Sequence, residues 1–210
     1  MRVHSHYTLL GGTPTLEGLA ARAAAEGMGR LALTDTNVLY GVVAFARACK
    51  REGIQPIVGM TVTVAAPDEK SGMKTGAGAA SAPAQLQGQL VLLATGVAGY
   101  RSLCKLSSLV QASPEREILA SRGLSWGDLE EHRDGLICLS GGRKGWVERH
   151  VRSGNLQAAS HYAGRLSDIY RDRVFLSLEL HTDDDRIIAE RVGMLGGLMG
   201  MSTAAVQPVF

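Results

Sequence analysis

Short apolar runs that alternate with helix-like segments are the feature that most limits what this chain can fold into. Each run is apolar along its whole length, which is typical of strands buried on both faces of a sheet. Strands that alternate with helices predict an α/β fold with a parallel sheet. The predicted strands are Leu31–Thr34, Ile57–Val64, Leu90–Ala94, Leu136–Leu139 and Val174–Leu180.

Helices are predicted between these strands. The first covers Thr15–Glu26, which starts beside Pro14, stops at Gly27 and carries apolar residues at helical spacing. Two others cover Tyr40–Glu52 and Leu156–Tyr170. The chain is therefore expected to run repeatedly from strand to helix and back to strand.

The whole chain is expected to form a single domain over residues 1–210, a length that suffices for one buried core. Hydrophobic residues make up 45% and charged residues 20%, which excludes a disordered chain. Residues 65–88 are rich in Ala, Gly and Ser and predict a flexible insertion between two strands. Residues 111–126 are of mixed polar composition and predict a surface connection.

The formal net charge of +2 is too small to draw in nucleic acid or a membrane by long-range attraction. The three cysteines, Cys49, Cys104 and Cys138, form no CxxC pair, so neither a zinc knuckle nor a disulfide framework is indicated. The first residues lack the apolar core of a signal peptide, and no run is long enough for a membrane span. We therefore expect a cytoplasmic protein.

Two histidines stand close together near the amino terminus, His4 and His6, with Ser5 between them and Tyr7 after them. On an extended strand they would point to opposite faces, but at the end of a strand both can turn towards one metal ion. The alternative interpretation is an exposed polar turn. The spacing alone does not decide between the two.

A second candidate is Asp35, which follows a predicted strand and is itself followed by Thr36 and Asn37. Carboxylates at the carboxyl ends of strands are common ligands and bases in α/β enzymes. The alternative is that Asp35, Thr36 or Asn37 caps the next helix.

Two later segments also follow strands. The glycine-rich segment Ser140–Gly145 contains Arg143 and Lys144 and could cradle a phosphate, although a tight turn with a basic tip explains it equally simply. His181 with the acidic run at 183–185 could hold a divalent cation, but such a run also favours a helix start. No GxSxG elbow or Cys–His pair indicates covalent catalysis. Three histidines, expected on solvent-facing helix positions, receive no role: His132, His150 and His161.

Five segments follow one another along nearly the whole chain: HSHYTLLGG, LALTDTNVLYGVVAFARACKREGIQPIVGMTV, QLVLLATGVAGYRSLCKLSSL, GLICLSGGRKG and VFLSLEL. Together they resemble the PHP domain of the bacterial DNA polymerase III alpha subunit. The resemblance implies a distorted (β/α)7 barrel of the PHP type, with any metal centre at the carboxyl ends of the strands. Active PHP proteins hold zinc, manganese or iron in a cluster of about three metals and hydrolyse phosphoesters.

The family's metal ligands, carried over by this resemblance, are mostly absent from the chain. The family's opening HxH falls on Arg2 and His4, so His6 lies outside the motif and only His4 is kept. Neutral residues, which are poor metal donors, stand where the family has its remaining ligands: Gly11, Thr36, Thr61, Gln89, Gly142, Ala205 and Gln207. The resemblance therefore implies a degenerate metal site, with no cofactor and no catalytic residue expected.

The resulting expectation is a non-catalytic PHP domain that acts as a structural or interaction module in DNA replication. Its expected partners are the polymerase body or replication accessory subunits, with DNA contacted only indirectly. One alternative is a residual metal-dependent phosphoesterase of the pyrophosphatase or 3′–5′ exonuclease type, using His4, His6, Asp35 and His181. Another is a stand-alone regulatory relic.

Overall fold

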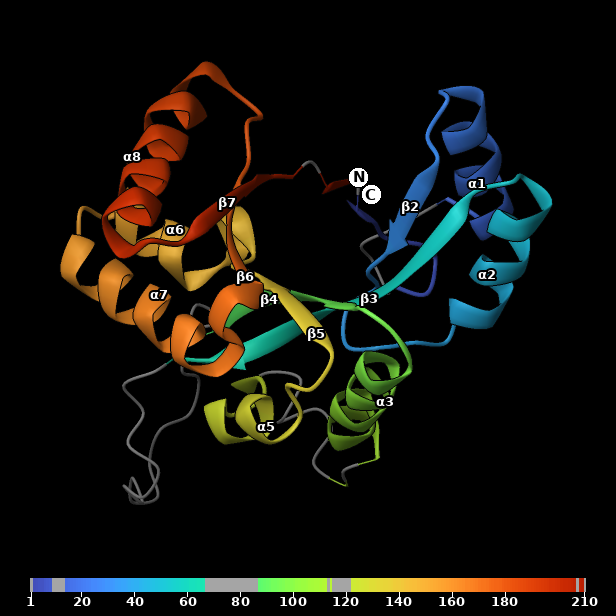
Figure 1. Cartoon of the computed structure of the whole chain (residues 1–210), viewed down its shortest axis with the longest axis horizontal. Helices are drawn as coiled ribbons and strands as arrows, with labels where there is room; N and C mark the ends of the chain where they lie inside the picture. The colour runs from blue at the N-terminus through green and yellow to red at the C-terminus, as the bar shows by residue number, and fades with distance from the viewer. Residues whose placement is uncertain are drawn as a thin grey trace.

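The strands of the molecule form one eight-stranded sheet in the order β7-β6-β5-β4-β3-β2-β1-β8 (Figure 1). The computed structural model describes residues 2–8, 14–66, 87–112, 114, 122–206 and 208–209. The strands are β1 (Arg2–Val3), β2 (Arg30–Leu33), β3 (Gln55–Ala65), β4 (Gln87–Ala94), β5 (Leu136–Leu139), β6 (Val174–Leu178), β7 (Ser202–Ala205) and β8 (Pro208–Val209).

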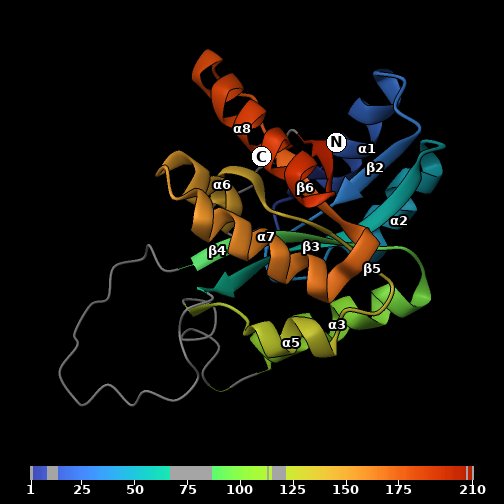
Figure 2. The same ribbon diagram turned by 60° about the vertical axis from the view of Figure 1, so that its left-hand side comes forward.

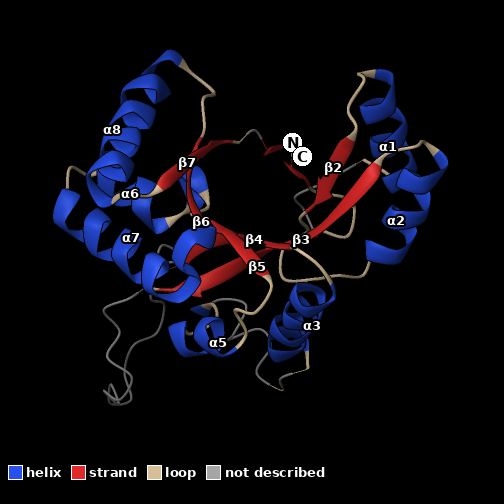
Figure 3. Cartoon of the chain, viewed as in Figure 1, coloured by secondary structure: helices blue, strands red, loops and turns tan. Residues whose placement is uncertain are grey.

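The sheet curls back on itself. Strands β7 and β8 form its two edges, yet only two residues separate them in sequence. The last segment of chain therefore links one edge of the sheet to the other, and the helices lie around the outside (Figure 3). This arrangement agrees with the distorted barrel that the sequence predicts.

The prediction of a parallel sheet is wrong for β4, which runs antiparallel to both β3 and β5. The pairing with β3 extends from Gly59 opposite Leu93 to Ala65 opposite Gln87. An antiparallel pair needs no crossover helix between its strands, and an apolar run does not reveal the direction of its strand. As a consequence, β4 begins at the end of the sheet where its neighbours β3 and β5 finish.

The helices are α1 (Leu16–Ala25), α2 (Val42–Arg51), α3 (Val97–Gln111), α5 (Trp126–Glu131), α6 (Trp146–Arg152), α7 (Leu156–Tyr170) and α8 (Asp183–Met199). One core cluster packs α1 and α2 against the outer face of β1 and β2, around Phe45. A larger cluster packs the later helices against β3 to β6, around Tyr162 and Tyr170. Figures 1 and 2 both place α3 beside α5, where the Ser102 hydroxyl donates a hydrogen bond to the Asp134 carbonyl. None of the helices in the described ranges is both long and apolar enough to cross a membrane.

Most predicted element boundaries hold to within two residues. The helix predicted at 15–26 forms with Thr15 as its N-cap, whose hydroxyl accepts a hydrogen bond from the Gly18 amide. The helix predicted at 40–52 starts later, because its N-cap is Gly41. The last predicted strand ends at Leu178, because the following residues turn towards α8.

Both β3 and β4 extend into the ends of the flexible insertion predicted at 65–88. Residues 67–86 lie outside the described part of the chain. The end of β3 is held by aromatic side chains. Trp146 Nε1 donates to the Val64 carbonyl at 3.4 Å, and both Trp126 Nε1 and the Tyr162 hydroxyl donate to the Ala65 carbonyl.

Candidate functional site

The loops that follow the parallel strands meet at one end of the curled sheet, together with the first residues of β4. This end contains His4 after β1, Asp35 after β2, the turn at 140–142 after β5 and Glu179 after β6. All of these side chains except the glycines of the turn are polar and largely buried. Buried polar groups at the carboxyl ends of barrel strands are the usual setting of an active site in this class of fold.

Asp35 is the most heavily bonded of these residues. Its Oδ1 accepts hydrogen bonds from the Ser5 amide at 2.7 Å and the Thr8 hydroxyl at 2.6 Å, and its Oδ2 accepts one from the Ser5 hydroxyl at 2.8 Å. The side chain is only 2% exposed. The carboxylate therefore ties the segment after β1 to the segment after β2.

His4 joins the same group through Thr8, with His4 Nδ1 lying 3.3 Å from Thr8 Oγ1. The single hydroxyl proton of Thr8 is given to Asp35, and Thr8 Oγ1 also accepts a hydrogen bond from the Thr36 amide. Thr8 Oγ1 can then only accept from the histidine. A hydrogen bond between the two residues therefore requires a proton on His4 Nδ1.

The interpretation of Asp35, Thr36 or Asn37 as a helix cap is wrong, because α2 begins at Val42 behind Gly41. Asn37 instead adopts a left-handed backbone with φ of 58°. Its side chain bonds to Thr63, accepting from the amide at 3.1 Å and donating to the hydroxyl at 3.0 Å. The segment thus packs against β3 before the chain enters α2.

The two neighbouring histidines are separated in space. His4 is 3% exposed and contacts Thr8, whereas His6 is exposed and lies against the Tyr7 ring at a centroid distance of 4.4 Å. The two imidazoles therefore do not form a pair of ligands in this structure. The exposed-turn interpretation applies to His6 and not to His4.

Glu179 forms a second buried group, which the sequence did not single out. Its Oε2 accepts a hydrogen bond from the Arg143 amide at 3.3 Å and lies 3.6 Å from His181 Nε2. A Cβ atom placed on Gly142 would overlap the Glu179 carboxyl group. The carboxylate thus fills the space beside Gly142 and accepts a hydrogen bond from one amide of the Ser140–Gly145 turn, which favours the tight-turn interpretation.

The acidic run at 183–185 starts a helix. Asp185 completes a capping box with Thr182, and its Oδ2 accepts hydrogen bonds from the His181 and Thr182 amides at 2.9 Å each. Its Oδ1 accepts a hydrogen bond from Arg152 at 2.5 Å. Arg152, aided by these backbone amides, lowers the pKa of the Asp185 carboxyl.

Arg152 also holds Glu148, at 2.8 Å between Nε and Oε1. Glu148 is 4% exposed, and burial raises its pKa, although Arg152 partly offsets the rise. The sequence interpretation missed this buried group of charges. Its only signal in the sequence was the spacing of Glu148 and Arg152 by four residues, which places both on one face of α6.

The four residues of the metal-site alternative do not converge on one point. His4 and Asp35 both contact Thr8, His181 lies beside Glu179, and His6 faces solvent. In the described ranges, no three His, Cys, Asp or Glu side chains are grouped so that they could hold a metal ion. At one position where the family has a ligand, the Thr61 hydroxyl donates to the Thr34 carbonyl at 2.9 Å.

Of the remaining histidines, His161 is exposed on α7 as predicted, and His132 ends α5 in a partly exposed position. His150 was also expected to face solvent, but this prediction is wrong. The residue is only partly exposed, and its ring lies beside those of Trp146 and Tyr162, at centroid distances of 6.0 and 5.6 Å. His150 therefore belongs to the aromatic layer that holds the end of β3.

Comparison with protein families gives a match to the PHP domain over residues 1–182. The DNA polymerase III alpha subunit of Bacillus subtilis (strain 168) is 30% identical over 210 residues, and the error-prone DNA polymerase of Symbiobacterium thermophilum is 33% identical over 206 residues. These matches cover 100% and 91% of this chain, but in each case only 17% of the relative.

Two solved structures share the fold. An amidohydrolase from Chromobacterium violaceum matches with a TM-score of 0.55 at 16% identity, covering 99% of this chain and 86% of its own. A putative metal-dependent phosphoesterase from Bifidobacterium adolescentis matches with a TM-score of 0.57 at 11% identity, covering 98% and 86%. At such low identity the likeness extends to the fold alone.

Proposed function

This chain belongs to the PHP domain family and is related to the alpha subunit of DNA polymerase III, and we propose that it acts as a non-catalytic PHP module. Its proposed role is to hold or dock other parts of a replicative polymerase. Its proposed partners are the polymerase body or replication accessory subunits, and it contacts DNA only through them. The net charge of +2 supports indirect rather than direct contact with DNA.

The observation that carries the proposal is the engagement of Asp35. Both of its carboxylate oxygens accept hydrogen bonds from Ser5 and Thr8, which leaves this acid as an internal acceptor. A metal ion chelated by both carboxylate oxygens of Asp35 would displace donors placed at 2.6–2.8 Å, and a displaced hydroxyl would remain in a buried setting. Asp35 therefore serves the structure of the barrel end.

The position of Glu179 adds support. Where the family has a cysteine ligand, this chain has Gly142, and the Glu179 carboxyl group fills the space beside it. The Arg143 amide and His181 lie against that carboxylate. The carboxylates of both Asp35 and Glu179 are thus engaged by other protein groups. The side chains at this end of the barrel do not fit a cluster of several metals.

The test is metal content and turnover of the purified protein. We expect less than stoichiometric zinc, manganese and iron by elemental analysis after incubation with each metal and desalting. We also expect no hydrolysis of p-nitrophenyl phosphate, pyrophosphate or a single-stranded oligonucleotide above the background of the free metal.

The comparison of two histidine variants makes this test specific. His4→Ala changes the buried imidazole, and His161→Ala changes an exposed one on α7. Stoichiometric metal and phosphoester turnover that disappear in His4→Ala but persist in His161→Ala would overturn the proposal in favour of a residual phosphoesterase. Equal behaviour of both variants and the wild-type protein, without turnover, supports the non-catalytic module.

A further inference from the structure

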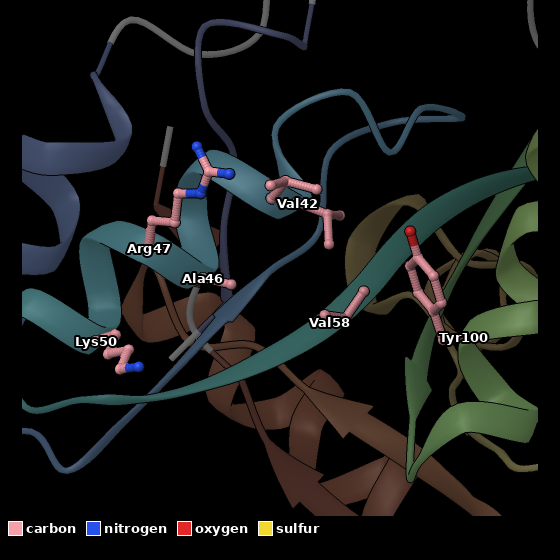
Figure 4. A pocket seen from close by; sticks show the side chains of 7 residues that line it. Val42, Ala46, Arg47, Lys50, Val58 and Tyr100 are labelled. Carbon is pink, nitrogen blue, oxygen red and sulfur yellow. The ribbon is translucent and has the colours of Figure 1, made fainter.

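A groove of about 460 Å³ lies between α2 and α3, over the first half of β3 (Figure 4). Its apolar wall on α2 is formed by Val42, Val43 and Ala46, Val58 of β3 lies at its floor, and Tyr100 of α3 faces them from the other side. None of the residues that line the groove belongs to the group around Asp35 and Glu179.

Helix α2 presents apolar side chains on two faces. One face packs Phe45, Ala48 and Cys49 into the core formed with α1 and β2. The other presents Val43, which is 59% exposed, to the groove, and Tyr100 across it is 39% exposed. These apolar side chains gather in one hollow and are not scattered singly over the surface.

Two cations border the groove, Arg47 and Lys50, both on α2. Neither has an ion pair within the described part of the chain, whereas Arg51 on the next position lies 3.6 Å from Glu17. None of the residues that line the groove is acidic. The site therefore combines an apolar floor with a border of two cations, and Glu17 lines a neighbouring hollow that shares Arg47 and Lys50.

We propose that this groove docks an acidic protein segment that inserts apolar side chains between α2 and α3 and places carboxylates against Arg47 and Lys50. The charges select an acidic partner, and the burial of Val43, Val58 and Tyr100 supplies the apolar contribution. A nucleic-acid strand would match the cations but would leave the valines against a hydrophilic backbone. The inference rests on the proposed role as an interaction module, for which it names the surface and the chemistry of the partner.

The test uses the whole chain and a defined probe. The probe is a fluorescent peptide of about 16 residues with leucines at helical spacing on one face and glutamates elsewhere, a length suited to a helix in a groove. Fluorescence anisotropy at low salt should detect binding that weakens as salt is added. Charge reversal in Arg47→Glu/Lys50→Glu and removal of the apolar wall in Val43→Ser should each weaken binding about tenfold or more.

Helix α8 provides the matched control, because Arg191 and the exposed Met194 lie on it, on another part of the molecule (Figure 1). The variants Arg191→Glu and Met194→Ser change the same kinds of side chain and should leave binding within about twofold of wild type. Undetectable peptide binding, equal weakening by the α8 variants, or tighter binding of a single-stranded oligonucleotide would each overturn the proposal. So would self-association of the chain that Val43→Ser abolishes.

The proposed function and this inference fail separately. A preparation that binds stoichiometric metal and hydrolyses phosphoesters, yet binds the acidic peptide through Arg47 and Lys50, would contradict the non-catalytic role and leave the docking groove standing. A preparation that has neither metal nor turnover and does not bind the peptide would contradict only the proposed docking at the groove.

Discussion

The carboxyl group of Glu179 lies in the space that any side chain at position 142 would enter, so Gly142 and Glu179 fit together as a pair. Gly142 also has φ of +58°, in the left-handed region that favours glycine. The relationship has a direct consequence for the cysteine that the resemblance to the family places at this position. Restoring the family's cysteine at position 142 requires both a strained backbone and displacement of a buried carboxylate.

We expect Gly142→Cys to lower the free energy of unfolding by about 2–4 kcal/mol, from backbone strain together with overpacking. The measurement is urea unfolding followed by tryptophan fluorescence. Adding Glu179→Ala should recover part of the loss, since it removes the overlap but not the strain. A double-mutant cycle gives the size of that recovery.

Gly154 provides the control for this experiment. It has φ of +76°, but no atom lies within 4 Å of a Cβ built on it. Gly154→Cys should therefore cost only the backbone strain, about 1 kcal/mol, and Glu179→Ala should not rescue it. Equal costs at the two glycines would show that Glu179 does not fill the space at Gly142.

Asp35→Asn is expected to lower the free energy of unfolding by about 2–4 kcal/mol. The amide keeps one acceptor oxygen, but its NH₂ group faces a donor from Ser5 or Thr8 in a buried setting. Asp128 is the matched control, because it accepts hydrogen bonds from the amide and hydroxyl of Ser125 at a helix start near the surface. Asp128→Asn should cost only about 0.5–1 kcal/mol.

Much of the fold follows from sequence patterns. Leucine-rich runs at β2 and β5, the Thr15 cap and the apolar spacing of α7 are local signals, and the structure places these elements where those signals predict them. The direction of β4 has no such signal, since Leu90–Ala94 has the same apolar pattern whichever way the strand runs. Its direction follows from its pairing with β3 and β5, which depends on residues far apart in sequence.

The candidate site was predicted less completely. The position of Asp35 after a strand correctly indicated a polar residue at the barrel end, but not that Ser5 and Thr8 would surround it. The contact between Glu179 and Gly142 joins residues from two strand ends, and no local spacing reveals it. Arg152 at the end of α6 contacts Asp185 at the start of α8. The sequence spacing therefore indicated only the contact between Glu148 and Arg152.

The Glu148 carboxyl gives a pH dependence of one sign. Burial raises the pKa of this carboxyl. At pH values between its unfolded and folded pKa, the folded protein therefore keeps a proton that the unfolded chain has released. Wild-type stability attributable to this group therefore falls as pH rises above the ordinary glutamate value of about 4.3. The difference in unfolding free energy between Glu148→Gln and wild type should accordingly rise between about pH 4 and pH 7. A difference that stays flat or falls over that range would contradict a raised pKa.

Asp185 gives a pH dependence of the opposite kind. Arg152, followed by the His181 amide, lowers its pKa, so the folded state releases this proton at pH values where the unfolded chain still binds one. The stability it contributes is present above the ordinary aspartate value of about 3.9 and is lost as pH falls towards the lowered value. Asp185→Asn should thus destabilise the protein at pH 7 and remove part of the stability loss below about pH 4.

This expectation is tested by measuring the free energy of unfolding of the wild-type protein and of Asp185→Asn as a function of pH in the acid range. The Asp128→Asn variant, which alters a capping carboxylate near the surface, controls for the general effect of losing one charge. Arg152→Gln should weaken the same acid dependence, since it removes the first cause of the lowered pKa while leaving Asp185 in place. If Asp185→Asn and wild type lost stability in parallel below pH 4, the Arg152–Asp185 contact would not survive in solution.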